Sequence, residues 1–199
     1  PSLIICIALW GAINTSLICL RQTDLKALIA YSSVGHIGLL IAGALTLSHI
    51  GYCGASFIII AHGLSSSALF SIANITYETT NTRSVYISKG LAMIFPYIAL
   101  WWFLLSAANI AAPPSINLFR EILLIISIIR YFPTAWLPLI LIRFLRAAYS
   151  LYLYTTSQHG QTPNFINPIN IPPTNNYSTI FLHLAPIILL ITKPELLLL

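Results

Sequence analysis

Long hydrophobic runs separated by short polar segments occupy almost the whole chain. A helix needs about 20 apolar residues to cross the hydrocarbon core of a bilayer, and most of the runs reach about that length. They predict six membrane-spanning segments, at about 2–20, 27–47, 52–75, 88–131, 135–156 and 177–192. A membrane β-barrel is disfavoured because its strands would be short and would alternate in polarity. The pattern therefore predicts an all-α membrane protein, with one transmembrane bundle over residues 1–199.

The fourth segment differs from the others, because 88–131 is too long for one crossing and Pro113-Pro114 interrupts it. Proline has no backbone donor, so carbonyl groups in the preceding turn lose their partners. Such gaps are tolerated at membrane depth only where protein or a water-filled cavity satisfies the backbone. Broken helices recur at the ion sites of transporters, but a simple proline kink would leave the same pattern, and both interpretations stay open here.

Composition agrees with a membrane protein, since only 7% of the 199 residues are charged, against about 25% in a soluble domain. The net charge of +5 comes without a basic cluster that would suggest nucleic-acid binding. Cys6, Cys19 and Cys53 are isolated in apolar runs and lack metal-site or redox spacing, so we expect them to pack and expect no metal site. The chain opens on Pro1 inside an apolar segment, which leads us to expect a fragment that lacks an N-terminal half.

The distribution of lysine and arginine predicts how the bundle is oriented. The loops at 21–26 and 77–89 fall on one side of a six-span bundle and hold four of the nine basic residues. Arg130 and Lys193 fall on the other side. Because basic loops stay on the inner side of a membrane, we expect the two loops inside and the C-terminus outside.

Three ionisable side chains fall near mid-depth of three different spans: His36, His62 and Glu121. Such groups are rare in a membrane and are by default a functional hypothesis. Histidine titrates near neutrality, with an unperturbed pKa of about 6.5, so it can take up and release protons at physiological pH. The three groups therefore suggest a proton relay. Candidate bridging hydroxyls lie one helical turn away, on Ser32, Ser33, Ser65 and Ser66.

Each of these features also has a simpler interpretation. A single buried histidine is more often a hydrogen-bonded packing element than a relay group, and serines in membrane helices often only permit close helix approach. The coincidence of His36, His62 and Glu121 at similar depth favours the functional interpretation. From the residues alone, the prediction stops at a membrane helix bundle that handles protons or other ions.

Five blocks of the chain resemble the chain 4 family of mitochondrial NADH:ubiquinone oxidoreductase (complex I), the antiporter-like subunits. They are RQTDLKALIAYSSVGHIG (21–38), IIIAHGLSSSALFSIANITYE (58–78), TNTRS (80–84), IAAPPSINLFRE (110–121) and AAYSLYLYTTSQ (147–158). The resemblance runs over essentially the whole chain and suggests the C-terminal portion of such a subunit.

The resemblance implies a proton-translocating subunit of the mitochondrial inner membrane, with the inner loops in the matrix and the C-terminus on the intermembrane-space side. It implies no cofactor in this chain, because flavin, iron–sulfur clusters and the quinone site belong to other subunits of the complex. The implied partners are other membrane subunits, notably the antiporter-like chains 2 and 5, and the lipid bilayer. The family's relay residues carry over by motif to His36, His62 and Glu121. Its paired half would lie upstream of Pro1, so this chain is not expected to pump alone.

Three arginines depart from the family pattern. Arg120 stands where the family normally has glycine, and Arg143 and Arg146 are unexpected inside the fifth span. The chain also has a single Met in 199 residues, while isoleucine is abundant. Many mitochondrial codes assign ATA to methionine, and some assign AGA and AGG to serine or glycine. We therefore hypothesise that the printed sequence was translated with the wrong codon table.

Two other functions are compatible with the sequence. One is a stand-alone cation/proton antiporter subunit of the same superfamily, and the other is a structural membrane spacer whose buried polar groups only pack. The RQTDLK and YETTNTRS blocks resemble the mitochondrial family more than antiporters, which favours the complex I subunit.

Overall fold

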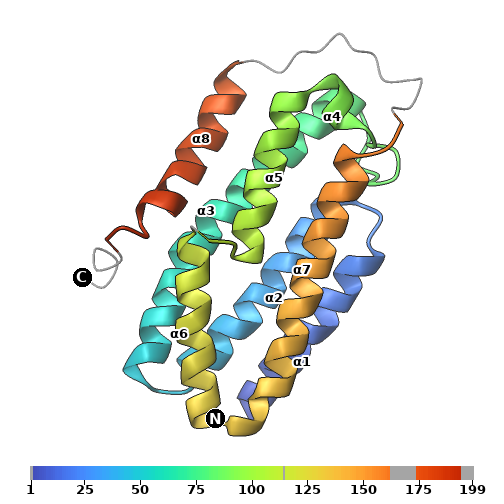
Figure 1. Ribbon diagram of the computed structural model, residues 1–199. Coiled ribbons are helices and arrows are strands. Elements are labelled where there is room, and N and C mark those ends of the chain that lie inside the picture. The colour runs from blue at the N-terminus through green and yellow to red at the C-terminus, as the bar shows by residue number, and fades with distance from the viewer. Residues whose placement is uncertain (1, 114, 162–173, 194–199) are drawn as a thin grey trace.

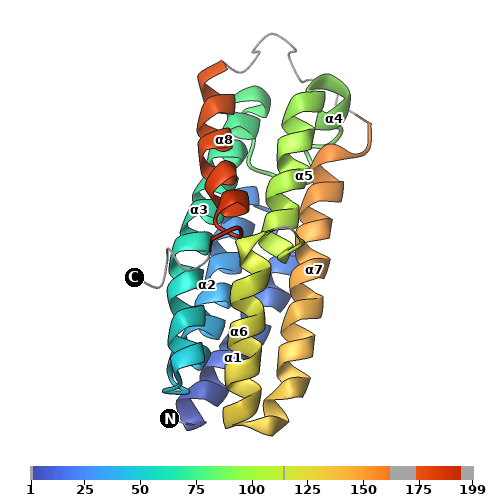
Figure 2. The same cartoon turned by 60° about the vertical axis from the view of Figure 1, so that its left-hand side comes forward.

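A computed structural model describes residues 2–113, 115–161 and 174–193 of the chain. This part is helical, in an elongated bundle with most helices running along its long axis (Figures 1 and 2). The elements are α1 Ser2–Arg21, α2 Leu25–Ala44, α3 His49–Thr80, α4 Leu91–Ile94, α5 Pro96–Ile110, α6 Ile116–Tyr131, the 3-10 turn η1 Pro133–Ala135, α7 Trp136–Gln158 and α8 Thr174–Leu189. The prediction of an all-α membrane protein is confirmed.

The membrane-spanning segments correspond to the helices in order. By length and composition, α1, α2, α3 and the continuous stretch Pro133–Gln158 can each cross a membrane. The predicted fourth segment is broken into α5 and α6, which follow each other end to end along the bundle in Figure 1. The predicted sixth segment corresponds to α8, which lies beside α3. Pro114 and most of the predicted loop at 157–176 lie outside the described residues.

A second interruption in the fourth segment was not predicted from the sequence. The chain breaks at Phe95, which ends the single-turn helix α4, and Pro96 opens α5. A residue before proline is disfavoured in helical conformation, whereas proline fits the first helical position well. The Phe95-Pro96 pair therefore separates α4 from α5, and the long predicted segment becomes three helices.

Local capping explains where the loops at 21–26 and 77–89 begin and end. Asp24 caps α2 by accepting a hydrogen bond from the amide of Lys26, and Asn81 ends α3 in the left-handed region at φ 52°, which asparagine tolerates better than most residues. The amide of Leu25 donates to the carbonyl of Arg83 at 2.9 Å. The loops at 21–26 and 77–89 are thus joined at one end of the bundle, as the prediction that they share a side requires.

Apolar residues form two main cores at the two ends of the bundle. The core nearer the loops at 21–26 and 77–89 includes Ile29 on α2, Trp102 on α5 and Tyr149 on α7. The other includes Leu39 on α2 and Leu139 on α7. Between the residues of these two cores lie buried His36 on α2 and buried Arg146 on α7.

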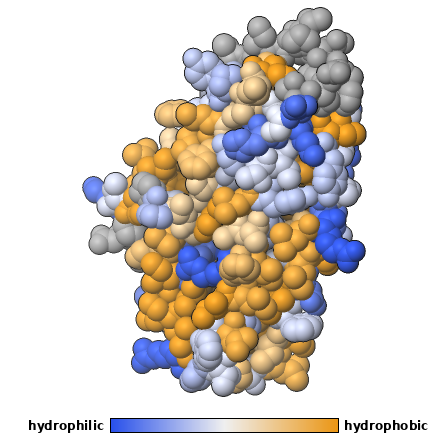
Figure 3. Space-filling model, turned by 45° about the vertical axis from the view of Figure 1, so that its right-hand side comes forward, coloured by the Kyte–Doolittle hydropathy of each residue, from blue (hydrophilic) through white to orange (hydrophobic). Residues whose placement is uncertain are grey.

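The outer surface is mostly apolar, as a lipid-facing bundle requires. Many large hydrophobic side chains are exposed, including Trp10, Ile59, Tyr97, Phe144 and Leu182. Figure 3 shows hydrophobic residues over much of one face, with hydrophilic residues gathered mainly towards its upper end. Exposed apolar area of this extent is unusual for a soluble monomer and marks contact with lipid or protein.

Candidate functional site

The two histidines that the sequence placed on separate helices lie against each other. The rings of His36 on α2 and His62 on α3 stack with their centroids 4.4 Å apart and their planes 25° from parallel. His36 is 1% exposed. Neither ring nitrogen of His62 has a hydrogen-bond partner among the residues that the structure describes. The sequence predicted similar depth for the two groups, but only the packing of α2 on α3 brings their rings into contact.

His36 has a polar partner on each side of its ring. Its Nε2 lies 3.1 Å from Oδ1 of Asn109 on α5, and its Nδ1 lies 3.4 Å from Nη2 of Arg120 on α6. A guanidinium has donors and no acceptor, so Nδ1 accepts from Arg120 and Nε2–H donates to the amide oxygen. These contacts fix one neutral tautomer of His36, with the proton on Nε2.

Arg120 is fully buried, and none of the described carboxylates forms an ion pair with its guanidinium group. Its remaining contacts are hydrogen bonds to the carbonyl groups of Asn117, at 3.4 Å, and Ile58, at 3.5 Å. Both are long for an N–H···O hydrogen bond, whose usual distance is about 2.9–3.0 Å. Arg120 points towards His36 and forms no ion pair with Glu121, since adjacent residues on a helix face in different directions.

Glu121 is paired with arginines of α7. Its carboxylate accepts a hydrogen bond from Nη1 of Arg146, and its second oxygen lies 3.6 Å from Nη2 of Arg143. Glu121 is 2% exposed and Arg146 is 3% exposed, while the side chain of Arg143 is 40% exposed. The carboxylate therefore joins α6 to α7, and no hydrogen bond links it to either histidine within the described chain.

The buried charges of this layer do not balance. The buried guanidinium groups of Arg120 and Arg146 carry two positive charges against one negative charge on Glu121, a net charge of 2 − 1 = +1, and the half-exposed Arg143 adds a third positive charge. Burying a charge without compensation costs several kcal/mol per ion. The other carboxylates in the described part, Asp24 and Glu78, lie at the end of the bundle that holds residues 21–26 and 77–89. A cavity of about 10 Å³ borders Glu121, which is roughly the space of one water molecule.

The candidate hydroxyls make local hydrogen bonds. Each donates to the carbonyl three residues earlier in its own helix, at 2.7 Å for Ser32 and Ser33, 3.2 Å for Ser65 and 3.4 Å for Ser66. Their protons are thus committed to the helix backbone, and only their oxygen lone pairs are free to accept. Bridging between the histidines by these hydroxyls remains a prediction.

At the helix break, side chains of the protein donate hydrogen bonds to backbone carbonyl groups before Pro113. Ala111 ends α5 in the left-handed region at φ 66°. Asn117 on α6 donates through Nδ2 to the carbonyl of Ala108 on α5 at 2.6 Å, and Ser115 donates to the carbonyl of Ala112 at 2.6 Å. Carbonyl groups around the break therefore find side-chain partners within the chain.

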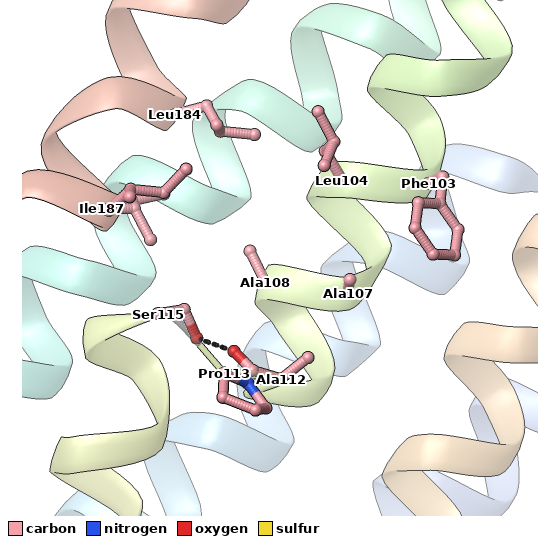
Figure 4. A pocket seen from close by; sticks show the side chains of 10 residues that line it. Phe103, Leu104, Ala107, Ala108, Ala112, Pro113, Ser115, Leu184 and Ile187 are labelled. Carbon is pink, nitrogen blue, oxygen red and sulfur yellow. Dashed lines mark hydrogen bonds between the residues drawn. The ribbon is translucent and has the colours of Figure 1, made fainter.

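A cavity of about 240 Å³ opens between α5, the residues at the break and α8 (Figure 4). Its lining is apolar apart from Ser115, with Phe103, Ala108, Leu184 and Ile187 around it. Glu121 does not line this cavity. The space beside the break and the small space beside the carboxylate are therefore separate.

Sequence reasoning missed two asparagines, Asn109 and Asn117, which flank the double proline in the SAANIAAPPSIN stretch. A buried amide in an apolar run must find hydrogen-bond partners, and this signal could have identified both. Within 2–113, 115–161 and 174–193, no group of three or more His, Cys, Asp or Glu side chains is placed to hold a metal ion.

Comparison with protein families matches residues 1–146 to the family described as NADH:quinone oxidoreductase/Mrp antiporter, transmembrane. The chain is 53% identical over 195 residues to NADH-ubiquinone oxidoreductase chain 4 of Lumbricus terrestris, which covers 98% of this chain and 43% of that protein. It is 47% identical over 189 residues to a protein of the same name from Anopheles arabiensis, covering 94% of this chain and 84% of that sequence.

The chain thus spans about two fifths of the length of most of the curated relatives compared here. Among solved structures, a chain of the respiratory complex I from Thermus thermophilus with bound NADH superposes with a TM-score of 0.90. Its identity is 21%, over 98% of this chain and 41% of that one. At this identity the likeness concerns the fold.

Proposed function

Because the chain belongs to the NADH:quinone oxidoreductase/Mrp antiporter family of transmembrane proteins, we propose that it is the C-terminal transmembrane bundle of a complex I chain 4. In this role it conducts protons across the mitochondrial inner membrane, coupled to electron transfer from NADH to ubiquinone in the assembled enzyme. It is not catalytic alone, since flavin, iron–sulfur clusters and the quinone site belong to other subunits.

The observation that carries the proposal is the contact of His36 with His62 in a buried layer that also holds Glu121. A neutral imidazole has one nitrogen that releases a proton and one that accepts it. Two stacked imidazoles at mid-depth can therefore pass protons if water or a hydroxyl connects their nitrogens. The unpartnered nitrogens of His62 are available for such a connection.

Two contacts must open before a proton passes through the layer. Arg120 donates to Nδ1 of His36, so the guanidinium must move before that nitrogen takes a proton. Glu121 is held by Arg146, so its carboxylate must leave this ion pair before it is protonated. These two contacts would prevent uncoupled proton flow, because a continuous proton path forms only when α6 or α7 moves.

The proposal includes partners and location. The apolar outer surface packs against lipid and against other complex I membrane subunits, notably the antiporter-like chains 2 and 5. The loops at 21–26 and 77–89 face the matrix, and the C-terminus lies on the intermembrane-space side. The relatives from animals, named as NADH-ubiquinone oxidoreductase chain 4, support the place in complex I and in mitochondria. The proposed orientation has its support in the positions of the basic residues.

Replacing Glu121 with Gln in the full-length subunit of the assembled complex tests the proposal. We expect a lower proton-to-electron ratio with NADH oxidation retained, because the amide cannot carry the proton. An unchanged ratio in the assembled complex would instead support the structural spacer. The family also includes Mrp antiporters, so co-purification decides between the two remaining functions: absence of other complex I subunits would support a stand-alone antiporter.

A further inference from the structure

Asn109 occupies the last turn of α5, immediately before the helix break. Its side chain is buried, and its Oδ1 accepts from Nε2 of His36 on α2. The next two residues, Ile110 and Ala111, end α5 in a left-handed turn. The amide therefore lies where the broken helix meets the histidine pair.

We propose that Asn109 is a positioning residue that fixes which nitrogen of His36 carries the proton and ties this choice to the helix break. The inference rests on the proposed function, because it concerns a relay through His36. It adds a residue to which neither the sequence motifs nor the relatives' names assign a task.

Two independent contacts of His36 select the same tautomer. The amide oxygen of Asn109 requires a proton on Nε2, and the guanidinium of Arg120 requires a lone pair on Nδ1. Both select the same neutral tautomer. The orientation of a histidine ring and its tautomer are set by the partner of its other nitrogen, so Asn109 leaves Nδ1 as the only site of His36 where a further proton can enter.

The passage of one proton reverses this tautomer. A proton that enters at Nδ1 gives an imidazolium with N–H groups on both nitrogens. When the contact with Asn109 opens, Nε2 gives its proton to a water molecule that carries it on. His36 is then left as the opposite tautomer, whose Nε2 lone pair faces the oxygen of Asn109. The amide must rotate to present its NH₂ group, or the ring must return the proton, before the next cycle. Asn109 is suited to this because it has both a donor and an acceptor and cannot itself be ionised.

A hydrogen bond between α6 and α5 links the amide to the break. The carbonyl of Ala108, the residue preceding Asn109, accepts from Nδ2 of Asn117 at 2.6 Å. This bond crosses from α6 to α5 over the interruption. A shift of α6 relative to α5 therefore pulls on the turn that carries Asn109 and changes its distance to His36. The broken helix and the tautomer of His36 are coupled through these two asparagines.

Four charged or titratable side chains share the buried layer with His36 and Asn109. His62 of α3 stacks on its ring, Arg120 of α6 donates to Nδ1, and Arg146 of α7 and Glu121 of α6 complete the charged layer. A change in the protonation of His36 therefore changes its electrostatic interaction with these side chains. The neutral side chain at 109 is the contact that can be altered without changing the charge.

The test compares three variants of the full-length subunit in the assembled complex: Asn109→Leu, Asn109→Gln and His36→Gln. The proton-to-electron ratio and the pH profile of NADH-driven proton transport are measured in sealed vesicles, and assembly is checked on native gels. We expect Asn109→Leu to lower the ratio and displace the pH profile by roughly half to one pH unit, the size of one lost hydrogen bond. Asn109→Gln keeps a neutral amide with a donor and an acceptor, and it should retain more of the ratio than the leucine variant.

The outcomes separate this inference from the proposed function. If His36→Gln leaves the ratio unchanged, the relay itself is refuted. If His36→Gln lowers the ratio but Asn109→Leu changes neither ratio nor profile, only the positioning by Asn109 is refuted. If Asn109→Leu prevents assembly, Asn109→Ala is measured in its place, and a wild-type pH profile for that variant likewise refutes the inference.

Discussion

Glu121 on α6 and Arg146 on α7 form an ion pair that is buried on both sides. It is the polar connection between the second half of the broken span and the next helix. Breaking such a pair by removing one partner is strongly destabilising, because the other charge stays buried without compensation. This makes Arg146 the residue on which the stability of the charged layer depends most.

Arg146→Leu should therefore destabilise the bundle by about 3–5 kcal/mol. Arg143→Leu is the matched control, because Arg143 is on the same helix and contacts the same carboxylate at 3.6 Å, but is 40% exposed. A half-exposed pair contributes about 1 kcal/mol or less. Thermal denaturation of the assembled complex in detergent measures both, and equal losses would contradict this ranking. Combining Arg146→Leu with Glu121→Leu should recover much of the loss, because apolar residues then replace the pair.

Gly43→Ala should destabilise the contact between α2 and α6. A Cβ at Gly43 would collide with the side chain of Leu124, and overpacking of this kind costs about 1–3 kcal/mol. Gly63→Ala is the control, since nothing lies within 4 Å of a Cβ at that position, and alanine is favoured over glycine in a helix by about 1 kcal/mol. Assembly yield and thermal stability should fall for the first variant only. Adding Leu124→Ala to Gly43→Ala should restore part of the loss.

The residues present at 120, 143 and 146 in the mature protein are open to direct measurement. Three guanidinium groups against one carboxylate are costly at membrane depth, and the hypothesis of a wrong codon table predicts serine or glycine at these positions. Peptide mass spectrometry of the subunit, together with the codons of the gene, decides the matter. AGA or AGG codons and small neutral residues would support the hypothesis, whereas CGN codons at all three positions would end it. A small residue at 120 would remove the contact of Arg120 with Nδ1 of His36, so that Asn109 would be the one of the two contacts left to select the tautomer.

The orientation of the bundle can be checked by labelling with an impermeant thiol reagent. Tyr86 is exposed in the loop at 77–89, and Tyr131 is exposed at the end of α6. Since the basic loops are expected in the matrix, Tyr86→Cys should react from the matrix side and Tyr131→Cys from the opposite side. Labelling of the native cysteines in the unmodified protein gives the background, which is subtracted. The reverse pattern would overturn the predicted orientation.

Much of the fold was accessible from the sequence because the bilayer limits the possible structures. Runs of about 20 apolar residues can only be helices there, since every backbone group must be satisfied inside the chain. The break at Pro113 was also predictable from the missing backbone donor. The extra break before Pro96 was not, because a single proline between apolar residues can also sit within a kinked membrane helix.

The sequence by itself determined an all-α bundle, the places of His36, His62 and Glu121 within hydrophobic segments, and the two loops at one end. It determined these because helix periodicity and hydrophobic length act locally along the chain. Only the tertiary structure decided which polar groups meet: that His36 stacks on His62 and binds Asn109, and that Glu121 pairs with Arg146. Contacts between helices depend on how each helix rotates and crosses its neighbours, and no spacing along one segment encodes the partner that another segment supplies.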